Sequence, residues 1–408
     1  MNILYINHYA GSKNMGMEFR PYYMGKIWLE MGHNVTIVGS SFSHLRVSQP
    51  NIDGSLSTEK VDGLNYVWIK GIKYVGNGFG RILNMMQFLF GLFFFQKNIV
   101  AQSQPDVVIA SSTYPMDIWP AKYIAQICDA RLVFELHDVW PQSLTEIAGL
   151  SRFNPLVILS GIAERAVYSS ADRVISMLPA INDHCAGLGF DTSNLTIVPN
   201  GIVFDDWSKN EVLLPDEIIS AITDMRFRDH MIVCYAGAHG IPNDLENLIN
   251  AADLLRNDKV SFLLVGDGNL KTELAKLINL KNIDNISMCK TVSKSMIPQL
   301  LELVDVGFIG AKNRSIYNHG ISPNKMADYM MAEIPIICAI KAGNDPVTEA
   351  SCGYTVTPSN PKALSCVILE MQSIGHTERK LMGRRGKEYA LQNYGYATLA
   401  KKFMDALK

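Results

Sequence analysis

Short apolar runs alternate with segments of helical spacing along most of the chain. The run NILYINHY is followed by the loop AGSKNMG, the helically spaced segment MEFRPYYMGKIWLEMGH and a second apolar run, NVTIVGS. The same order of strand, glycine-containing turn and helix returns at HMIVCYAGAHG, where we predict a helix from about Asp244 to Leu255 and then the strand VSFLLVGDG. Such alternation is typical of a parallel sheet with helices on both faces. Because it begins twice, the sequence predicts an α/β protein with two doubly wound domains.

Further apolar runs predict the remaining strands of both sheets. They are residues 106–111, 130–136, 172–177 and 195–199 in the first half, and 285–290, 305–310, 334–340 and 353–358 in the second. The stretch PNGIVFDDW, residues 199–207, ends a strand with proline, asparagine and glycine, so we place the domain boundary there. The last segment, about 376–407, has helical spacing with a break at NYGY.

Composition indicates an ordinary globular protein and a reducing compartment, and it excludes few functions. The chain is 48% hydrophobic and 19% charged, as in ordinary globular proteins, and its net charge of −2 gives no overall reason to expect nucleic acid. Seven cysteines without CxxC spacing indicate reduced thiols in a cytoplasm rather than disulfides or zinc. The N-terminus shows no basic region followed by a long apolar run, so we expect no secretory signal.

The most apolar window is ILNMMQFLFGLFFF, residues 82–95. At about 14 residues it is too short for a bilayer, which needs about 20. The residues leave two interpretations open: a buried core helix, or a helix that lies in a membrane interface. Arg81 and Lys97 at its ends suit the second, because cationic side chains can reach lipid headgroups.

The clearest chemical signal is GISPNKMADYMMAEIPII, where a helix follows a strand and a polar loop. Ser322 is a plausible N-cap and Pro323 suits the first helical position. With Asn324 they begin a helix whose free N–H groups and dipole attract an anion, and Lys325 in the first turn fits a bound phosphate. Asp328, one turn on, could accept hydrogen bonds from a ribose diol. The alternative is a capped helix with a solvated lysine.

Glycine loops follow two strands of the second half. Gly266 and Gly268 stand between the strand VSFLLV and the helix NLKTELAKLINL, and Gly237 and Gly240 follow the strand at HMIVCYA. They predict either close approach of the backbone to a nucleotide or simple strand-to-helix turns. A single GxG does not distinguish the two.

Titratable side chains crowd the end of the strand ARLVFEL in the first half. Glu135, His137 and Asp138 stand together in ELHDVWPQS, and such groups at a strand's carboxyl end are active-site candidates. The loop AGSKNMGMEFR offers Gly16, Glu18 and Arg20 for contact with a sugar or phosphate. The alternative for the histidine is a structural role, and for the loop a tight turn.

Several motifs are absent from the sequence. It has no GxxxxGK[ST], HExxH or GxSxG, and no DxD occurs anywhere. We therefore expect no bound metal. If a nucleoside diphosphate binds, a helix dipole and a lysine must neutralise it.

The motifs taken in order resemble one family. EFRPYYMGKIW, ELHDVWPQSL, IVPNGI, VGDGNLKTEL, SPNKMADYMMAEIPII and AGNDPVTEASCGYTVTP extend over nearly the whole chain. Together they resemble the retaining GT-B glycosyltransferases of family 4, and within them the WbuB-type branch that transfers N-acetylfucosamine-like sugars in O-antigen or capsule assembly.

The resemblance implies two Rossmann-like domains that face each other across a cleft. Residues 1–200 would bind the acceptor and carry the membrane-facing segment 82–95. Residues 201–385 would bind the nucleotide-sugar, and residues 386–408 would form a helix that crosses back to the first domain.

The resemblance also implies roles for single residues. Asp328 matches the second acid of the family's EX7E motif, whereas the first falls at Gly320, so the usual acidic contact to the transferred sugar lacks its residue. The main chain of residues 322–325 would bind the diphosphate, and that of Thr291 and Val292 would read the base. The segment IPNDLEN lacks the family's Arg and Lys, for which Lys325, Lys312 or Arg314 would compensate. His137 and Asp138 would act at the sugar.

The implied activity is retaining, metal-independent and free of cofactors. A sugar, expected to be a UDP-linked N-acetylated deoxy sugar, would pass to a polyprenyl diphosphate-linked saccharide at the inner face of the cytoplasmic membrane. A lipid-linked acceptor held at the membrane favours the membrane-interface interpretation of residues 82–95. Two rival functions stay open: a UDP-sugar 2-epimerase of the same fold, and a non-catalytic nucleotide-sugar-binding protein.

Overall fold

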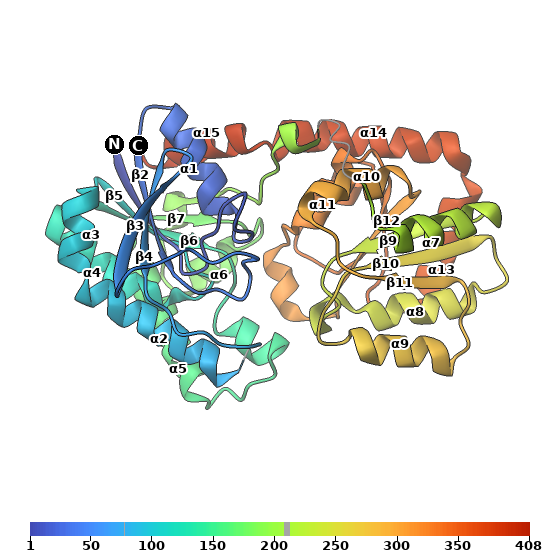
Figure 1. Ribbon diagram of the computed structural model, residues 1–408, viewed down its shortest axis with the longest axis horizontal. Helices are drawn as coiled ribbons and strands as arrows, with labels where there is room; N and C mark the ends of the chain where they lie inside the picture. The colour runs from blue at the N-terminus through green and yellow to red at the C-terminus, as the bar shows by residue number, and fades with distance from the viewer. Residues whose placement is uncertain (77, 208–212) are drawn as a thin grey trace. The chain divides into compact units, whose positions relative to one another are not determined.

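The computed structural model describes residues 1–76, 78–207 and 213–408. These residues form two compact units: unit 1 contains Met1–Asn200 and Tyr396–Lys408, and unit 2 contains Gly201–Gly395. Each unit is built around a single sheet of mainly parallel strands with helices packed against it (Figure 1). The predicted α/β class with two doubly wound sheets is confirmed.

Unit 1 has an eight-stranded sheet with the order β3-β4-β2-β1-β5-β6-β7-β8. All neighbours are parallel except β3 and β4, which form an antiparallel hairpin. The strands are β1 (Asn2–Ile6), β2 (Asn34–Ser40), β3 (Leu56–Val61), β4 (Leu64–Ile69), β5 (Val107–Ala110), β6 (Arg131–Leu136), β7 (Arg173–Ser176) and β8 (Leu195–Ile197). Its helices are α1 (Arg20–Glu30), α2 (Phe79–Phe94), α3 (Gln96–Ser103), α4 (Ile118–Cys128), α5 (Pro155–Ser170), α6 (Asn182–Gly187) and α15 (Tyr396–Ala406), with short turns η1 (Pro115–Asp117), η2 (Ser143–Ile147) and η3 (Thr192–Asn194).

Unit 2 has a six-stranded parallel sheet with the order β11-β10-β9-β12-β13-β14. The strands are β9 (Met231–Ala236), β10 (Val260–Val265), β11 (Ile286–Cys289), β12 (Val306–Gly310), β13 (Ile336–Ala339) and β14 (Gly353–Thr355). Its helices are α7 (Asp216–Phe227), α8 (Leu245–Leu254), α9 (Lys271–Leu280), α10 (Ile297–Glu302), α11 (Asn324–Met331), α12 (Pro346–Glu349), α13 (Pro361–Ser373) and α14 (Gly375–Asn393), with short turns η4 (Phe204–Trp207), η5 (Ile241–Asn243), η6 (Lys294–Met296) and η7 (Ser315–His319).

Alternation along the strands of unit 2 builds two cores, one on each face of the sheet. On β9, Val233 and Tyr235 pack with α8, α9 and α13, whereas Ile232 and Cys234 pack with α7, α10 and α11. A strand buried on both faces reads as a continuous apolar run, which is why these strands were predictable from the sequence.

The hairpin β3–β4 was missed by the sequence analysis. β3 is an edge strand with only partly buried or exposed residues, LSTEKV, and carries polar side chains that a surface loop would also carry. β4 is well buried, but polar residues surround both strands, so a search for apolar runs does not detect the hairpin.

The segment that returns to unit 1 begins later than the predicted residue 386. Helix α14 continues to Asn393 within unit 2, and Tyr396–Lys408 belong to unit 1. Gly383 and Gly386 let α14 pack closely on unit 2, because a Cβ at Gly383 would lie 1.8 Å from the carbonyl oxygen of Glu333. Figure 1 shows α15 beside α1, near both termini.

Residues 82–95 fall almost entirely in α2, which has two unlike faces. One face buries Asn84, Met85, Phe88, Leu89, Gly91 and Leu92. The other leaves Phe90 65% and Phe94 80% exposed. Among the described residues, no helix combines the length and apolarity needed to cross a bilayer.

Candidate active site

In each sheet the strand order changes direction at one point, and a crevice forms at such a point in doubly wound sheets. Connections leave β9 towards β10 on one side and later return to β12 on the other, and β1 and β5 stand in the same relation in unit 1. In doubly wound sheets, ligands bind beyond the carboxyl ends of strands at such points. The side chains after β9 and β12, and those after β1 and β5, are therefore the ones to examine.

Lys325 is a partly buried cation, and among the described residues it has no carboxylate partner. Its Nζ donates to the hydroxyl of Tyr235 at 3.0 Å and to Oδ1 of Asn243 at 3.1 Å, and lies 4.3 Å from the centre of the Tyr235 ring. Burial lowers the pKa of Lys325 to about 8. In the part of the chain that the structure describes, no carboxylate lies within ion-pair distance of it, so the site lacks one negative charge.

The start of α11 differs by one residue from the prediction. Pro323 is the N-cap, with an extended ψ of 132°, and the helix begins at Asn324, so Ser322 lies outside it. The proline ring fixes φ but allows ψ to be extended, and the chain enters the helix only after it. Lys325 stays in the first turn, as predicted.

His239 is a site residue that the sequence analysis passed over. It is fully buried after β9, and neither ring nitrogen has a hydrogen-bond partner. Burial lowers the pKa of His239 to about 4, and the nearby charges of Lys271 and Lys325 act in the same direction while Asp267 opposes them. The neutral ring thus keeps one donor and one acceptor unused beside Lys325. The available signal was the single titratable residue within AGAHG.

The glycines predicted to approach a nucleotide are required by the fold itself. Gly237, Gly266 and Gly268 have φ values of 153°, 154° and 158°, which other residues rarely adopt. A Cβ at Gly266 would lie 1.9 Å from the carbonyl oxygen of Gly237 and 3.2 Å from Nε2 of His239. The loops after β9 and β10 therefore touch each other beside the unpartnered imidazole.

Asp328 faces the loop that carries Thr291 and Val292. Its Oδ1 lies 3.6 Å from Nζ of Lys294, just beyond those two residues in sequence. Burial raises the pKa of Asp328, and the charge of Lys294 opposes that rise. Asp328 therefore lies within reach of η6, which begins two residues after Val292, and the ribose and base roles stay predictions.

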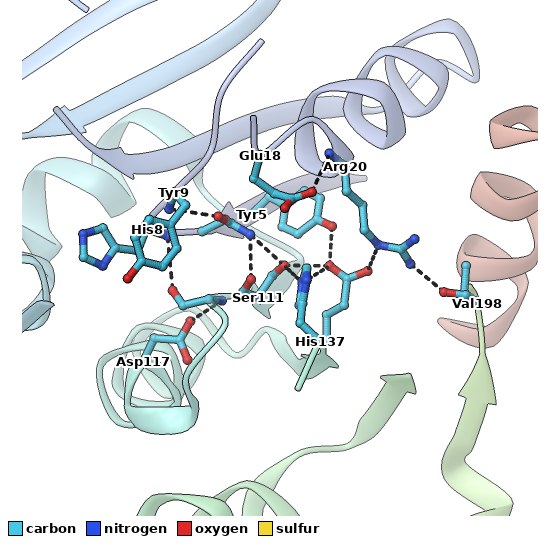
Figure 2. Close-up of polar contacts among 12 residues, drawn as sticks. Tyr5, His8, Tyr9, Glu18, Arg20, Ser111, Asp117, His137 and Val198 are labelled. Carbon is cyan, nitrogen blue, oxygen red and sulfur yellow. Dashed lines mark hydrogen bonds and ion pairs between the residues drawn. The ribbon is translucent and has the colours of Figure 1, made fainter. Parts of the chain in front are cut away.

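In unit 1 a buried network is centred on Glu135, and Figure 2 labels its partners Tyr5, Arg20, Ser111 and His137. Its carboxylate accepts hydrogen bonds from the Tyr5 hydroxyl at 2.5 Å, the Ser111 hydroxyl at 2.6 Å and Nε of Arg20 at 2.8 Å. Burial alone would raise the pKa of Glu135, but Arg20 and the hydrogen bonds from His137 and Ser111 hold it well below its usual value. Glu135 is therefore a permanent buried anion.

Arg20 does not line an open surface. It is fully buried, and its two terminal nitrogens donate to the backbone carbonyls of Pro199 at 2.6 Å and Val198 at 2.8 Å. Together with the bond from Nε to Glu135, these two bonds join the start of α1 to β6 and to the chain after β8. Gly16 and Glu18, which were grouped with Arg20, stay nearer the surface.

His137 is oriented by this network. Its Nε2 lies 2.9 Å from the Ser111 hydroxyl and 3.3 Å from Oε2 of Glu135. The Ser111 hydroxyl donates its only proton to Glu135, so it accepts a hydrogen bond from His137. Nε2 of His137 therefore carries the ring proton. Asp138 is exposed beside it.

Asp117 was not anticipated. It lies in η1 after β5, where its Oδ2 accepts from the backbone N–H of Ser112 at 2.9 Å while Oδ1 is buried without a partner. Burial raises the pKa of Asp117 to about 7. Only its position after a central strand could have indicated it.

Two family models match the chain in tandem. The model described as a glycosyl transferase 4-like domain matches residues 16–201, and the one described as glycosyl transferases group 1 matches residues 230–373. The first match falls on unit 1 and the second on unit 2.

Two relatives named as glycosyltransferases match the chain, and solved structures share its fold. The chain is 23% identical over 313 residues to the probable glycosyltransferase WbjE of Pseudomonas aeruginosa, covering 74% of this chain and 76% of WbjE. It is 22% identical to the putative colanic acid biosynthesis glycosyl transferase WcaI of Escherichia coli, over 61% of each. HepE of Anabaena, solved in complex with UDP, superposes with a TM-score of 0.69 at 14% identity over 100% of this chain and 99% of HepE.

Proposed function

The chain is a glycosyltransferase of the GT-B type, and we propose that it moves a sugar from a nucleoside diphosphate-sugar to a lipid-linked saccharide in surface polysaccharide synthesis. The observation that supports donor binding is the partly buried Lys325, which has no carboxylate partner in the described residues. A desolvated cation is costly unless an anion pairs with it, and the start of α11 adds free N–H groups at the same place.

The donor lies over unit 2 in this proposal. The diphosphate accepts hydrogen bonds from Lys325 and from the N–H groups at the start of α11, the ribose diol donates to Asp328, and the base meets the main chain at Thr291 and Val292. UDP is the proposed nucleotide, supported by the UDP bound in HepE.

The proposed transfer retains configuration and uses no metal. The bond between C1 of the sugar and the phosphate oxygen breaks, and its electron pair stays with the departing diphosphate. Lys325 stabilises that growing charge, so binding is strongest in the transition state. The acceptor hydroxyl attacks C1 from the same face and its proton passes to the departing phosphate oxygen.

The acceptor and sugar lie over unit 1 in this proposal. His137 and Asp138 at the end of β6 contact the sugar, and Gly16 and Glu18 contribute the loop after β1. Arg20 and Glu135 act as positioning residues, because Glu135 and Ser111 together set the orientation of His137.

The lipid-linked acceptor is supported by the exposed face of α2. Phe90 and Phe94 point outward, and the ring of Phe93 lies 6.3 Å from that of Tyr123 on α4, which with Ile127 extends the apolar surface. Lys97 stands at its edge. An apolar helix face with cationic flanks fits a peripheral site on the inner face of the cytoplasmic membrane. The N-acetylated deoxy sugar of the WbuB-type branch rests on the resemblance of the motifs.

The test is transfer of label to lipid. The purified chain is incubated with UDP-linked N-acetylated deoxy sugars labelled in the sugar, with and without lipid-linked saccharides, in the presence of EDTA. We expect label in the organic phase only when acceptor lipid is present. Label that returns as a water-soluble C2 epimer would indicate the epimerase, and nucleotide binding without turnover would indicate a sensor; either result contradicts the proposal.

A further inference from the structure

Arg46, in the loop after β2, is a buried cation without a carboxylate. It is 5% exposed, its guanidinium lies 4.9 Å from the centre of the Trp68 ring, and Nη2 donates to the carbonyl of Ser40. Nε and Nη1 are buried and have no hydrogen-bond acceptor. The facing carboxylate, Glu59 on β3, accepts instead from Nε1 of Trp68.

This arrangement costs stability in the free protein. Burial lowers the pKa of Arg46 to about 10, so the side chain still carries its charge at neutral pH. A buried charge without a partner, and two donors without acceptors, are each unfavourable. Such a group is explained when a ligand supplies the missing anion.

A second arginine, Arg81, and a histidine, His44, lie near Arg46. Arg81 lies in the first turn of α2, which contains no acid, and donates from Nε to the Tyr9 hydroxyl at 3.0 Å. His44 is exposed, and its Nδ1 lies 2.7 Å from the hydroxyl of Tyr74. Burial lowers the pKa of His8, which lies beside Tyr9 after β1 (Figure 2), and the charges of Arg46 and Arg81 act in the same direction. Burial and the charge of Arg81 also lower the pKa of His44 to about 4, so its neutral ring can offer a hydrogen bond but no charge.

The position of this cluster connects it to the acceptor loop and to the apolar helix. Gly16 pairs with Arg46 in an antiparallel bridge, and the N–H of Val47 donates to the carbonyl of Met15 at 2.8 Å. On the other side, Tyr74 packs against Gly80 in the first turn of α2. The cluster therefore stands between the loop after β1 and the beginning of the helix whose outer face is exposed and apolar.

We propose that Arg46, Arg81 and His44 bind the diphosphate of the lipid-linked acceptor, with its lipid chain leaving along the exposed face of α2. This inference rests on the proposed function. A planar guanidinium with two free donors matches two phosphate oxygens, and the uncapped start of α2 adds positive potential. A carboxylate of an acidic acceptor sugar has related chemistry, and the experiment separates the two.

The experiment uses the full chain and farnesyl diphosphate, a short prenyl diphosphate, measured by titration calorimetry below its micelle concentration. Farnesol controls for the lipid chain, and glucuronic acid is the competing carboxylate. Arg46→Met keeps the length of the side chain and removes the charge, and Arg81→Gln is the second variant. Arg152→Gln, an exposed arginine of the same unit, is the matched control. UDP binding is measured on every variant.

We expect farnesyl diphosphate to bind the wild-type chain at least tenfold more tightly than farnesol. Arg46→Met and Arg81→Gln should each weaken it at least tenfold, whereas Arg152→Gln should not. Because Arg46 has no carboxylate partner and two of its nitrogens have no acceptor, Arg46→Met should melt no lower than wild type without ligand. Equal binding by wild type and Arg46→Met, or displacement by glucuronic acid but not by pyrophosphate, would overturn the inference. In both cases intact UDP binding would leave the proposed function standing, and loss of UDP binding by the wild-type chain would defeat that function instead.

Discussion

Some charged side chains in the interior of this chain are fully paired, and others have no partner of opposite charge. Glu135 is surrounded by donors from Tyr5, Ser111 and Arg20, so its charge is satisfied within the fold. Arg46 is buried and Lys325 is partly buried, but in the described residues neither has a carboxylate partner. The first pattern stabilises the fold, and the second leaves room for an anionic ligand.

Glu135→Gln tests the first pattern. Removing the charge leaves Arg20 buried beside a neutral amide, and breaking a buried pair costs about 3–5 kcal/mol. Urea unfolding should show a loss of that size in the free energy of unfolding. Glu30→Gln, on the exposed end of α1, is the control and should change it by less than about 0.5 kcal/mol. A loss no larger than the control's would mean that the network does not hold unit 1 together.

The pKa of Lys325 predicts how UDP binding depends on pH. With its pKa lowered to about 8, the side chain loses its proton as pH rises through that value, and the attraction for phosphate disappears with it. We therefore expect UDP affinity to be constant from pH 7 to 7.5 and to fall above pH 8. Phosphate itself is fully ionised there, since its second pKa is about 6. Lys325→Met should bind weakly with no such fall, and a flat profile in the wild-type chain would contradict the assignment.

Single residues differ in how far the sequence could reveal them. Lys325 was predictable because a lysine in the first turn of a helix opposes the helix dipole. His239, Asp117 and Arg46 were not, since what marks them is one or more buried polar atoms without a hydrogen-bond partner in a packed core. That absence depends on contacts between residues far apart in sequence. Arg20 shows the converse: its loop position suggested a ligand contact, whereas its nitrogens bond to Glu135 and to the backbone after β8.

Among the elements, α2 combines two roles that its sequence alone left as alternatives. Gly91 allows close contact with β4, because a Cβ there would lie 2.5 Å from Cγ2 of Ile69. The opposite face exposes its phenylalanines. The helix is thus both a core element and an apolar surface. The strands buried on both faces were predicted well, and the amphipathic edge strand β3 was not, because half-exposed strands carry the polar residues of loops.

The double variant Phe90→Ser and Phe94→Ser tests the apolar face of α2. Both side chains are exposed, so the fold should be unaffected, but each loses part of the about 1.5–3 kcal/mol that burying a phenylalanine provides. Sedimentation with vesicles containing anionic lipid should show binding weakened at least tenfold. Phe227→Ser, equally exposed but in unit 2, should sediment like wild type. If the double variant also sediments like wild type, α2 is not the membrane contact.

In the whole molecule, the chain ends in the unit where it begins. Trp28 on α1 donates from Nε1 to the carbonyl of Ala400 at 3.2 Å, and its ring lies 5.0 Å from that of Phe403. Helix α15 therefore covers buried residues of unit 1. The sequence indicated a returning helix by resemblance, but its start depends on where α14 stops packing on unit 2.

Deleting residues 396–408 tests this arrangement. Uncovering Trp28 should shift its fluorescence to longer wavelength and lower the melting temperature of unit 1 by several degrees, because one core face loses its cover. UDP binding by unit 2 should persist. Removing Lys408 alone, which is exposed, is the control. A truncated chain that melts like the control would show that α15 contributes nothing to unit 1.

The most direct test of the central claim is titration calorimetry of UDP at pH 7 with wild type, Lys325→Met and Lys276→Met. Lys276 is an exposed lysine on α9 of the same unit. A charge-assisted hydrogen bond contributes about 1.5–3 kcal/mol, so we expect Lys325→Met to bind UDP at least tenfold more weakly, with Lys276→Met unchanged. Wild-type affinity in Lys325→Met, or no UDP binding by the wild-type chain, would contradict the claim that this partly buried cation holds the donor's diphosphate.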